Sequence, residues 1–142
     1  MKQCDQSACI RIDIDDLRTF NNEISHLAGD NVLKTIVTVL RQKVKPRDKI
    51  YRVGGDEFAI ICQDFTGLEA EGTMQRVASS LKSKVIRGQG RGGQQVEKQI
   101  TLSIGISDCD NGSKITKAFE FAEQAALESK ENGKNRITRF GG

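Results

Sequence analysis

Residues 53–58 read VGGDEF, and this short stretch separates two apolar runs. The run IYRV precedes it and the run FAIIC follows it, so the sequence predicts a β-hairpin with strands at 49–53 and 58–63. Two adjacent glycines suit a type I′ turn, which requires positive φ. A turn does not need two acids, yet Asp56 and Glu57 follow the glycines directly. The rest of the chain must show whether these carboxylates have a chemical role.

Hydrophobic periodicity places the other elements around this hairpin. We expect further strands at 8–14, 96–107 and 136–140. Helices are expected at 16–24 and 68–86. Two more helices are expected, one that starts at the N-cap Asp30 and ends at Pro46, and one that starts at the cap Ser113 and ends near Gly133. This order predicts an α+β fold, a βαββαβ sheet of the ferredoxin-like or polymerase-palm type with its helices on one face, plus an extra helix and an edge strand. The chain, 1–142, is expected to form a single domain.

A glycine-rich stretch at 87–95 spells G-x-G-x-x-G at Gly88, Gly90 and Gly93. That pattern binds dinucleotides where a strand enters and a helix leaves, because the helix N-terminus must face the pyrophosphate. Here a predicted helix enters and a predicted strand leaves. We therefore reject a dinucleotide site and expect a flexible connection.

Bulk composition excludes several classes of protein. The net charge of +3 is too small to predict a nucleic-acid partner. Four widely spaced cysteines and a single histidine, His26, give little support for a zinc site. No run approaches the roughly 18 apolar residues of a membrane span, and no signal-peptide pattern opens the chain. We therefore expect a cytoplasmic protein without direct membrane insertion.

The predicted sheet brings distant acids together. In a βαββαβ sheet the first and third strands are antiparallel neighbours, so Asp13, at the end of the first strand, should lie beside Asp56 and Glu57. Clustered carboxylates repel one another unless a cation joins them, and hard oxygen ligands favour Mg²⁺ or Mn²⁺. Metal sites of this kind activate a hydroxyl and offset charge in phosphoryl chemistry.

Three basic residues are the expected complement of such a site. Arg18 follows the first acidic cluster, and Lys130 and Lys134 lie on the last predicted helix and at its exit. Together with the acids they suit bound phosphates. Taken singly, each is more often a surface charge, and the hairpin alone is equally a plain Gly-Gly turn with solvated acids. Local sequence leaves both interpretations open.

Four segments in the right order resemble the GGDEF-domain diguanylate cyclases. These are DIDDLRTFNNEISHLAGDNVL, RVGGDEF, TLSIGIS and SKENGKNRI, and they span nearly the whole chain. The resemblance implies a palm-like fold and condensation of two GTP into cyclic di-GMP with release of two pyrophosphates. It further implies that each domain holds one GTP and Mg²⁺ (or Mn²⁺). The reaction would then take place across a homodimer.

The resemblance also implies roles for individual residues, carried over by position. The metal would be bound by Asp13, the carbonyl oxygen of Ile14, Asp56 and Glu57. The catalytic residues would be Asp56, as base for the 3′-hydroxyl, and Arg18, at the phosphates. Substrate would be bound by Asn21 and Asp30 at the guanine edge, Leu33 beside the base, Arg52, Lys130 and Lys134 at the phosphates, and Gly54 and Gly55 where phosphate approaches the backbone.

Asp30 would then set nucleotide specificity. One carboxylate can accept hydrogen bonds from both N–H groups of guanine, whereas adenine offers no matching pair. Asp30 is equally a candidate for a helix N-cap, and the two roles can coexist at a helix start.

Some positions depart from the family pattern. Arg18 replaces a lysine, and Ser25 stands where glycine is usual. The family's inhibitory product site begins with R-x-x-D, which here is Lys45-Pro46-Arg47-Asp48. Because lysine cannot make the two-pronged contacts of arginine, Lys45 and Asp48 predict weak or absent product inhibition.

The resemblance leaves an alternative function. The family's upstream D-x-L-T-x-L-x-N-R segment is missing, so we expect either a piece of a larger sensor protein or a divergent short form. The competing hypothesis is a non-catalytic GGDEF module that binds GTP or cyclic di-GMP and regulates a partner. The intact acid set at Asp13, Asp56 and Glu57 favours the enzyme.

Overall fold

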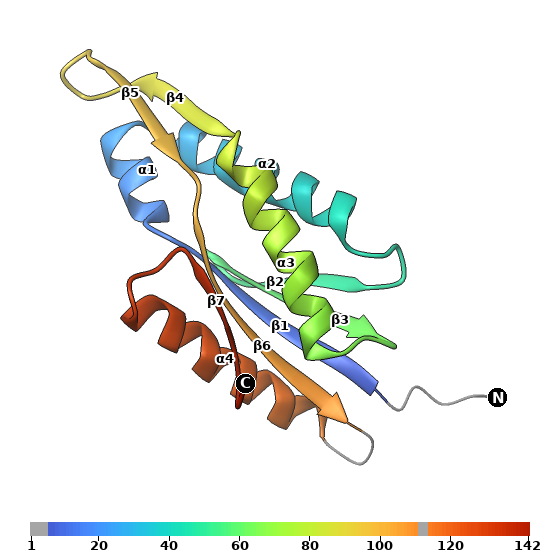
Figure 1. Cartoon of the computed structure of the whole chain (residues 1–142). Helices are drawn as coiled ribbons and strands as arrows, with labels where there is room; N and C mark the ends of the chain where they lie inside the picture. Colours follow the sequence, from blue (N-terminus) through green and yellow to red (C-terminus); the bar gives the residue numbers. More distant parts are fainter. Residues whose placement is uncertain (1–5, 111–113) are drawn as a thin grey trace.

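The computed structural model describes residues 6–110 and 114–142 (Figure 1). In chain order the elements are β1 (Gln6–Ile14), α1 (Leu17–Glu23), α2 (His26–Lys43), β2 (Lys49–Gly54), β3 (Glu57–Gln63), α3 (Gly67–Lys82), β4 (Val85–Gln89), β5 (Gln95–Gln99), β6 (Leu102–Asp110), α4 (Ile115–Glu131) and β7 (Arg136–Arg139). None of the helices in the described part is long and apolar enough to cross a membrane.

A five-stranded sheet carries the fold, in the order β2-β3-β1-β6-β7. Strand β1 lies in the middle and pairs antiparallel with both β3 and β6, and β7 joins β6 in parallel. The first and third strands are therefore neighbours, as predicted. Their register sets Asp13 opposite Glu57, which decides where the candidate site forms.

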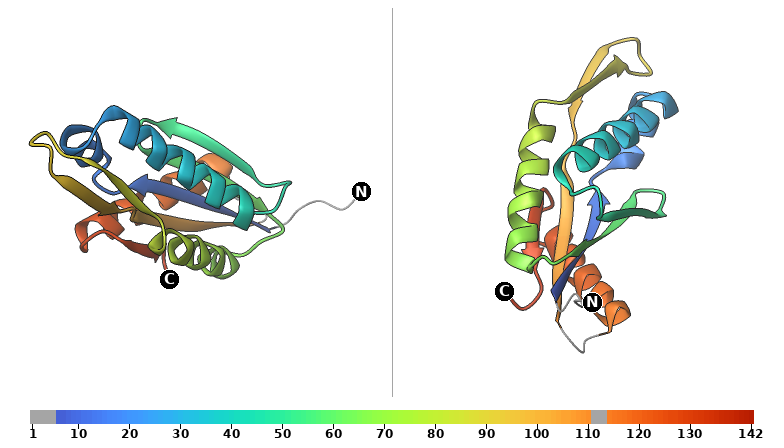
Figure 2. Two further views of the ribbon diagram at one scale, coloured as in Figure 1. Left: turned by 90° about the horizontal axis from the view of Figure 1, so that it is seen from above. Right: turned by 90° about the vertical axis from the view of Figure 1, so that its right-hand side faces the viewer.

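Successive side chains of β1 point to opposite faces of the sheet, so the core has two layers. Ile10 and Ile12 point into the large cluster shared with α2 and α3, whereas Cys9 packs with Ala118 and Ala122 of α4. The two helices of the βαββαβ core thus share one face, as expected, and the extra helix α4 covers the opposite face (Figures 1 and 2).

Helix α4 approaches the sheet closely because β6 has a glycine at the contact. A Cβ atom on Gly105 would lie 2.0 Å from the carbonyl oxygen of Ala122 and 2.2 Å from the amide nitrogen of Ala126. Both of these are backbone atoms, so no side-chain rotation could relieve the contact. Gly105 therefore fixes the height of α4 above the sheet.

The start of α2 differs from the prediction. The helix begins at His26, and the Oγ atom of its N-cap Ser25 accepts a hydrogen bond of 3.0 Å from the amide of Ala28. Asp30 lies inside the helix rather than at its N-cap, so the capping prediction was wrong. Its carboxylate is instead exposed at the helix surface.

The segment after α3 also differs. Helix α3 ends at Lys82, and the expected flexible connection is a second hairpin formed by β4 and β5. The predicted strand 96–107 is divided between β5 and β6. This hairpin extends away from the main sheet (Figure 1), and an ion pair of 2.9 Å joins Arg87 to Glu97 across it.

Two smaller predictions concern turns. Neither Gly54 nor Gly55 has a positive φ, and the register shifts between Arg52 and Gly54. A bulged hairpin therefore replaces the expected type I′ turn. The predicted cap Ser113 lies outside the described residues, and α4 begins after Lys114, which makes no side-chain capping bond.

Candidate active site

Three carboxylates meet where β1 ends and β3 begins. Asp13, Asp56 and Glu57 each offer one oxygen, and these atoms all lie within 4.8 Å of one another. The amide of Ile14 donates a 2.9 Å hydrogen bond to the carbonyl oxygen of Asp56, which ties the hairpin turn to the end of β1. The predicted cluster is thus formed by residues far apart in the sequence.

The environment of Asp13 disfavours the charged form of its carboxyl group. Asp13 is only 7% exposed, and its pKa is raised, first by burial and further by the charges of Asp56 and Glu57, although Lys130 opposes the shift. Burial alone would lower the pKa of Lys130, but its hydrogen bond to Asp13 and the three carboxylates raise it. Asp13 is therefore a buried carboxylate beside two others that repel it, and this all-oxygen donor set fits a divalent cation.

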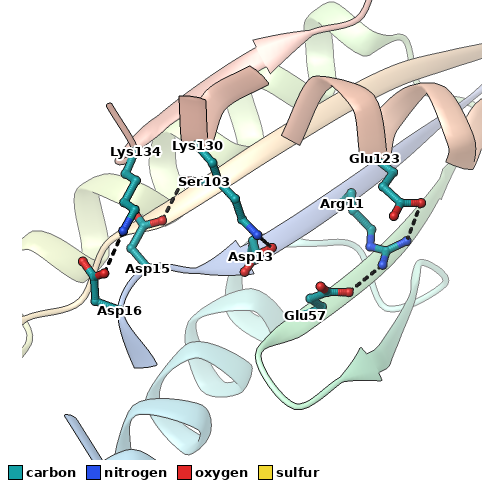
Figure 3. Close-up of polar contacts among 9 residues, drawn as sticks. All are labelled: Arg11, Asp13, Asp15, Asp16, Glu57, Ser103, Glu123, Lys130 and Lys134. Atoms are coloured by element: carbon teal, nitrogen blue, oxygen red, sulfur yellow. Dashed lines mark hydrogen bonds and ion pairs between the residues drawn. The ribbon is translucent and has the colours of Figure 1, made fainter. Parts of the chain in front are cut away.

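Ion pairs connect the C-terminal end of α4 and the segment after it to Asp13 and Asp16 (Figure 3). Lys130 pairs with Asp13, and Nζ of Lys134 lies 2.7 Å from Oδ1 of Asp16. The bond to Asp16 raises the pKa of Lys134. Lys130 therefore lies beside the carboxylate cluster, whereas Lys134 contacts Asp16.

Asp15 has a structural role that the sequence analysis did not identify. Its buried carboxylate accepts hydrogen bonds from Oγ1 of Thr101 at 2.7 Å, from Oγ of Ser103 at 2.6 Å and from the amide of Asn135 at 3.0 Å. It thereby joins the end of β1 to β6 and to the segment that follows α4. Asp16, the next residue, adopts a left-handed conformation with φ of 57° and turns toward Lys134.

A cavity of about 510 Å³ lies beside the carboxylates. Its walls include most of the residues predicted to bind substrate, namely Arg18, Asn21, Asp30, Leu33, Arg52 and Gly55, together with Asp56. Asp13, Glu57 and Lys130 line a smaller cavity of about 110 Å³ next to α4. The acid cluster therefore lies between the two cavities, with Asp56 facing the larger one.

Asn21 is positioned by its packing on α2. A Cβ atom on Gly29 would lie 1.8 Å from Oδ1 of Asn21, so the side chain occupies the space that this glycine leaves. Helix α1 can therefore hold the Asn21 amide in the wall of the larger cavity, close to Asp30.

Arg52 braces the hairpin turn. Its guanidinium group donates hydrogen bonds to the carbonyl oxygens of Gly54 at 3.2 Å and Gly55 at 2.7 Å. A Cβ atom on Gly55 would meet nothing within 4 Å, so the backbone at this position is open.

The predicted inhibitory residues lie elsewhere. Both oxygens of Asp48 accept backbone hydrogen bonds, from Lys45 at 3.2 Å and from Gln63 at 3.4 Å, and the Lys45 ammonium group lies 4.7 Å from the centre of the Phe65 ring. Gln63 ends β3, the strand that Glu57 begins. The predicted inhibitory residues and the carboxylate cluster therefore lie at opposite ends of β3.

A larger cavity, of about 620 Å³, is lined by Asn22, Glu23, Arg91, Gln94 and Val96. It contains a single carboxylate and lies between α1 and the β4–β5 hairpin. Its size does not make it the better candidate, because it lacks the clustered donors that a metal or a phosphate requires.

The sequence analysis also missed Arg11. A terminal nitrogen of its guanidinium group lies 2.6 Å from Oε2 of Glu57, and the other terminal nitrogen lies 3.8 Å from Oε2 of Glu123 (Figure 3). The available signal was a lone cation inside an apolar strand, two residues before Asp13 and therefore on the same face.

A family model described as diguanylate cyclase, GGDEF domain, matches residues 1–136. The chain belongs to the GGDEF family. It is 31% identical over 130 residues to Diguanylate cyclase A of Treponema denticola, covering 91% of this chain and 34% of the relative. It is 30% identical over 132 residues to Probable diguanylate cyclase DgcT of Escherichia coli, covering 91% and 28%. The chain thus spans about a third of the length of these GGDEF relatives.

Solved GGDEF structures share the fold. The GGDEF domain of DgcB from Caulobacter crescentus in complex with c-di-GMP matches with a TM-score of 0.85 at 25% identity, over 96% of this chain and 79% of that one. The active GGEEF domain of a diguanylate cyclase from Vibrio cholerae matches with a TM-score of 0.83 at 24% identity, over 95% and 83%. These matches confirm the α+β palm-like fold. Diguanylate cyclases of the GGDEF family use a divalent metal ion.

Proposed function

We propose that this chain is an active diguanylate cyclase that condenses two GTP into cyclic di-GMP and releases two pyrophosphates. The observation that carries this proposal is the cluster of Asp13, Asp56 and Glu57 beside a cavity that Asn21 and Asp30 also line. A metal-binding group and a candidate base-recognition group thus share one site, as a nucleotide-condensing enzyme requires.

We assign Mg²⁺ (or Mn²⁺) to the carboxylate cluster, held by Asp13, Asp56, Glu57 and the carbonyl oxygen of Ile14. When bound, the ion offsets negative charge on the reacting phosphate and makes the attacking hydroxyl more acidic. Asp56 faces the larger cavity, so we assign it the further task of accepting the proton of the 3′-hydroxyl.

The larger cavity would hold the nucleotide. Asn21 and Asp30 bind the guanine edge, and Asp30 accepts from its two N–H groups, which adenine does not offer in that arrangement. Leu33, half-buried in the same wall, packs beside the base. Asp30 lies exposed inside the helix rather than at its N-cap. Its carboxylate is therefore not occupied by helix N–H groups and is available to the guanine edge.

Positive charge for the phosphates comes from several elements. Arg18 lines the cavity from α1, Lys130 pairs with Asp13 of the cluster, and Lys134 pairs with the nearby Asp16. A metal ion on Asp13 would release Lys130 from its ion pair, so that the ammonium group can turn to phosphate. Arg52 supports the same region through the carbonyl oxygens of Gly54 and Gly55, and Gly55 leaves the backbone open.

The reaction needs two copies of the chain. Each large cavity suits one nucleotide, whereas cyclic di-GMP is made from two, so the 3′-hydroxyl of each GTP must reach the α-phosphate of the other. We therefore propose a homodimer in which two such cavities face one another.

We also propose that product inhibition through Lys45 and Asp48 is weak. Asp48 accepts a hydrogen bond from the amide of Lys45, and the Lys45 ammonium group lies over the Phe65 ring. In addition, lysine lacks the two-pronged contacts of the arginine that is usual in the family.

The test is chromatography of the products formed by concentrated protein with GTP and Mg²⁺, with Asp56→Ala as the matched control. Cyclic di-GMP from the parent protein and none from the variant would support both the activity and the assignment of Asp56. Binding of GTP without product, at concentrations where the protein is dimeric, would instead indicate a non-catalytic binding module. Absence of GTP binding in the presence of Mg²⁺ would refute the proposed site.

A further inference from the structure

Arg11 is an unusual residue for its position. It lies in the central strand β1 between Ile10 and Ile12, both of which are completely buried. Its own side chain is only 18% exposed. Arginine is rarely buried unless it is paired, so the partners of this side chain should explain its presence.

One partner dominates. A terminal nitrogen of Arg11 donates a hydrogen bond of 2.6 Å to Oε2 of Glu57. The contact with Glu123 on α4 is longer, at 3.8 Å, and that carboxylate is 63% exposed. The Nε atom of Arg11 is buried and has no hydrogen-bond partner in the described part of the chain. The side chain is thus anchored mainly by Glu57 (Figure 3).

This arrangement is poorly suited to stabilising the fold. An unsatisfied buried N–H group costs free energy, and a desolvated ion pair is often no more stable than apolar residues of similar volume. An unbranched apolar side chain would fit the strand without either cost. Glu57 is 33% exposed and could be hydrated if Arg11 were absent.

The same arrangement is well suited to holding Glu57 in place. Glu57 stands within 4.8 Å of two other carboxylates that repel it, and its partial exposure would allow it to turn outward. A short charge-assisted hydrogen bond to one of its oxygens opposes this movement. The bond engages one carboxylate oxygen, Oε2, and so holds the side chain beside the other two acids.

We propose that Arg11 is a positioning residue that holds Glu57 ready to bind the divalent metal ion. This inference rests on the proposed function, because it assumes that Asp13, Asp56 and Glu57 form the metal site. Arg11 touches neither nucleotide nor metal in this scheme, and it acts through Glu57 alone.

The experiment measures Mn²⁺ affinity without nucleotide, from the electron paramagnetic resonance signal of free Mn²⁺. The proteins are the parent chain, Arg11→Met, Arg11→Lys, Glu57→Gln, the double variant Arg11→Met/Glu57→Gln, and Glu123→Gln as the matched control. We expect Arg11→Met to weaken Mn²⁺ binding about tenfold, the usual effect of losing a group that orients a ligand. We expect no further loss from Arg11→Met when Glu57 is already glutamine, and little change in Glu123→Gln.

Arg11→Lys separates geometry from charge. Lysine keeps the positive charge but lacks the planar fork, so a positioning role predicts weaker Mn²⁺ binding in this variant too. Thermal unfolding without metal serves as the fold control, and we expect Arg11→Met to unfold at nearly the same temperature as the parent. If Arg11→Met does not fold, Arg11→Lys carries the test.

The outcomes distinguish the two proposals. No Mn²⁺ binding by the parent chain, or equal binding by Glu57→Gln, would refute the metal site and with it the proposed function. Normal behaviour of those two proteins, combined with unchanged or tighter binding in Arg11→Met, would overturn the role of Arg11 alone. An equal loss from Arg11→Met in both backgrounds would also overturn it, because the effect would then not pass through Glu57.

Discussion

Replacing Gly29 with alanine should separate nucleotide binding from stability. The new Cβ atom would lie 1.8 Å from Oδ1 of Asn21 and 2.9 Å from its Cγ, so the Asn21 side chain must leave its place. Because these atoms are the end of a side chain, the displacement is cheap. Alanine is also better than glycine inside a helix by about 1 kcal/mol. We therefore expect the free energy of unfolding to change by less than about 1 kcal/mol, the size of that helix term.

Nucleotide binding should respond differently. The variant loses the hydrogen bond that we assign between Asn21 and guanine, and a neutral hydrogen bond contributes about 0.5–1.5 kcal/mol, or about two- to twelvefold in affinity. Calorimetry with GTP and Mg²⁺, alongside thermal unfolding, measures both quantities. Asn21→Ala is the matched variant and should weaken GTP binding to a similar extent.

The double variant Gly29→Ala/Asn21→Ala provides the decisive comparison. If Gly29 acts only by making room for Asn21, the double variant should bind GTP no more weakly than Asn21→Ala does. Additive losses, or unchanged GTP affinity in Gly29→Ala, would refute the reasoning.

Four further predictions follow from the site and the core. Asp30→Asn should weaken GTP binding by about 1.5–3 kcal/mol, the range for a hydrogen bond to a charged group, with ATP binding unchanged in a competition assay. Because the pKa of Asp13 is raised mainly by burial, its contribution to metal-free stability is full below the ordinary carboxyl pKa and is lost as pH rises through the raised value; thermal unfolding at a series of pH values should show this loss, and Asp13→Asn should abolish it. Mg²⁺ at a hundredfold excess over its dissociation constant should stabilise the parent by about 2.7 kcal/mol and leave Asp13→Asn unaffected. Gly105→Ala should destabilise the protein by about 3 kcal/mol or more in denaturant unfolding, because the added Cβ meets the backbone of α4; a loss below about 1 kcal/mol would contradict this packing.

The sequence predicted the strand neighbours well because the relevant signals are local or follow from topology. Apolar alternation identified β1 and β3, and the antiparallel pairing of first and third strands then set Asp13 opposite Glu57. The helix start was mistaken because Ser25 and Asp30 are both good N-cap residues, and Gly29 lowers the expectation of helix between them. Ala28 and Gly29 are buried in the helix, and only this packing makes Ser25 rather than Asp30 the N-cap of α2.

Other features depend on contacts that a single sequence does not display. The β4–β5 hairpin is polar and glycine-rich, pairs only within itself among the described strands, and so lacks the apolar alternation of a core strand. Arg11 and Asp15 have partners 46 to 120 residues away along the chain. Their roles follow from the register of β1 with its neighbours, which the sequence indicates only in outline.

The segment from Asp13 to Asp16 assigns a different direction to each acid. Asp13 faces the carboxylate cluster, Asp15 is bonded to Thr101 and Ser103 in the interior, and Asp16 turns through a left-handed conformation toward Lys134. The direction of each acid depends on how many residues separate it from the paired part of β1, because a shift by one position exchanges the two faces of a strand. A deletion or insertion of one residue here would therefore misplace every acid together, whereas a substitution would affect one. The length of this segment is constrained more strictly than its composition.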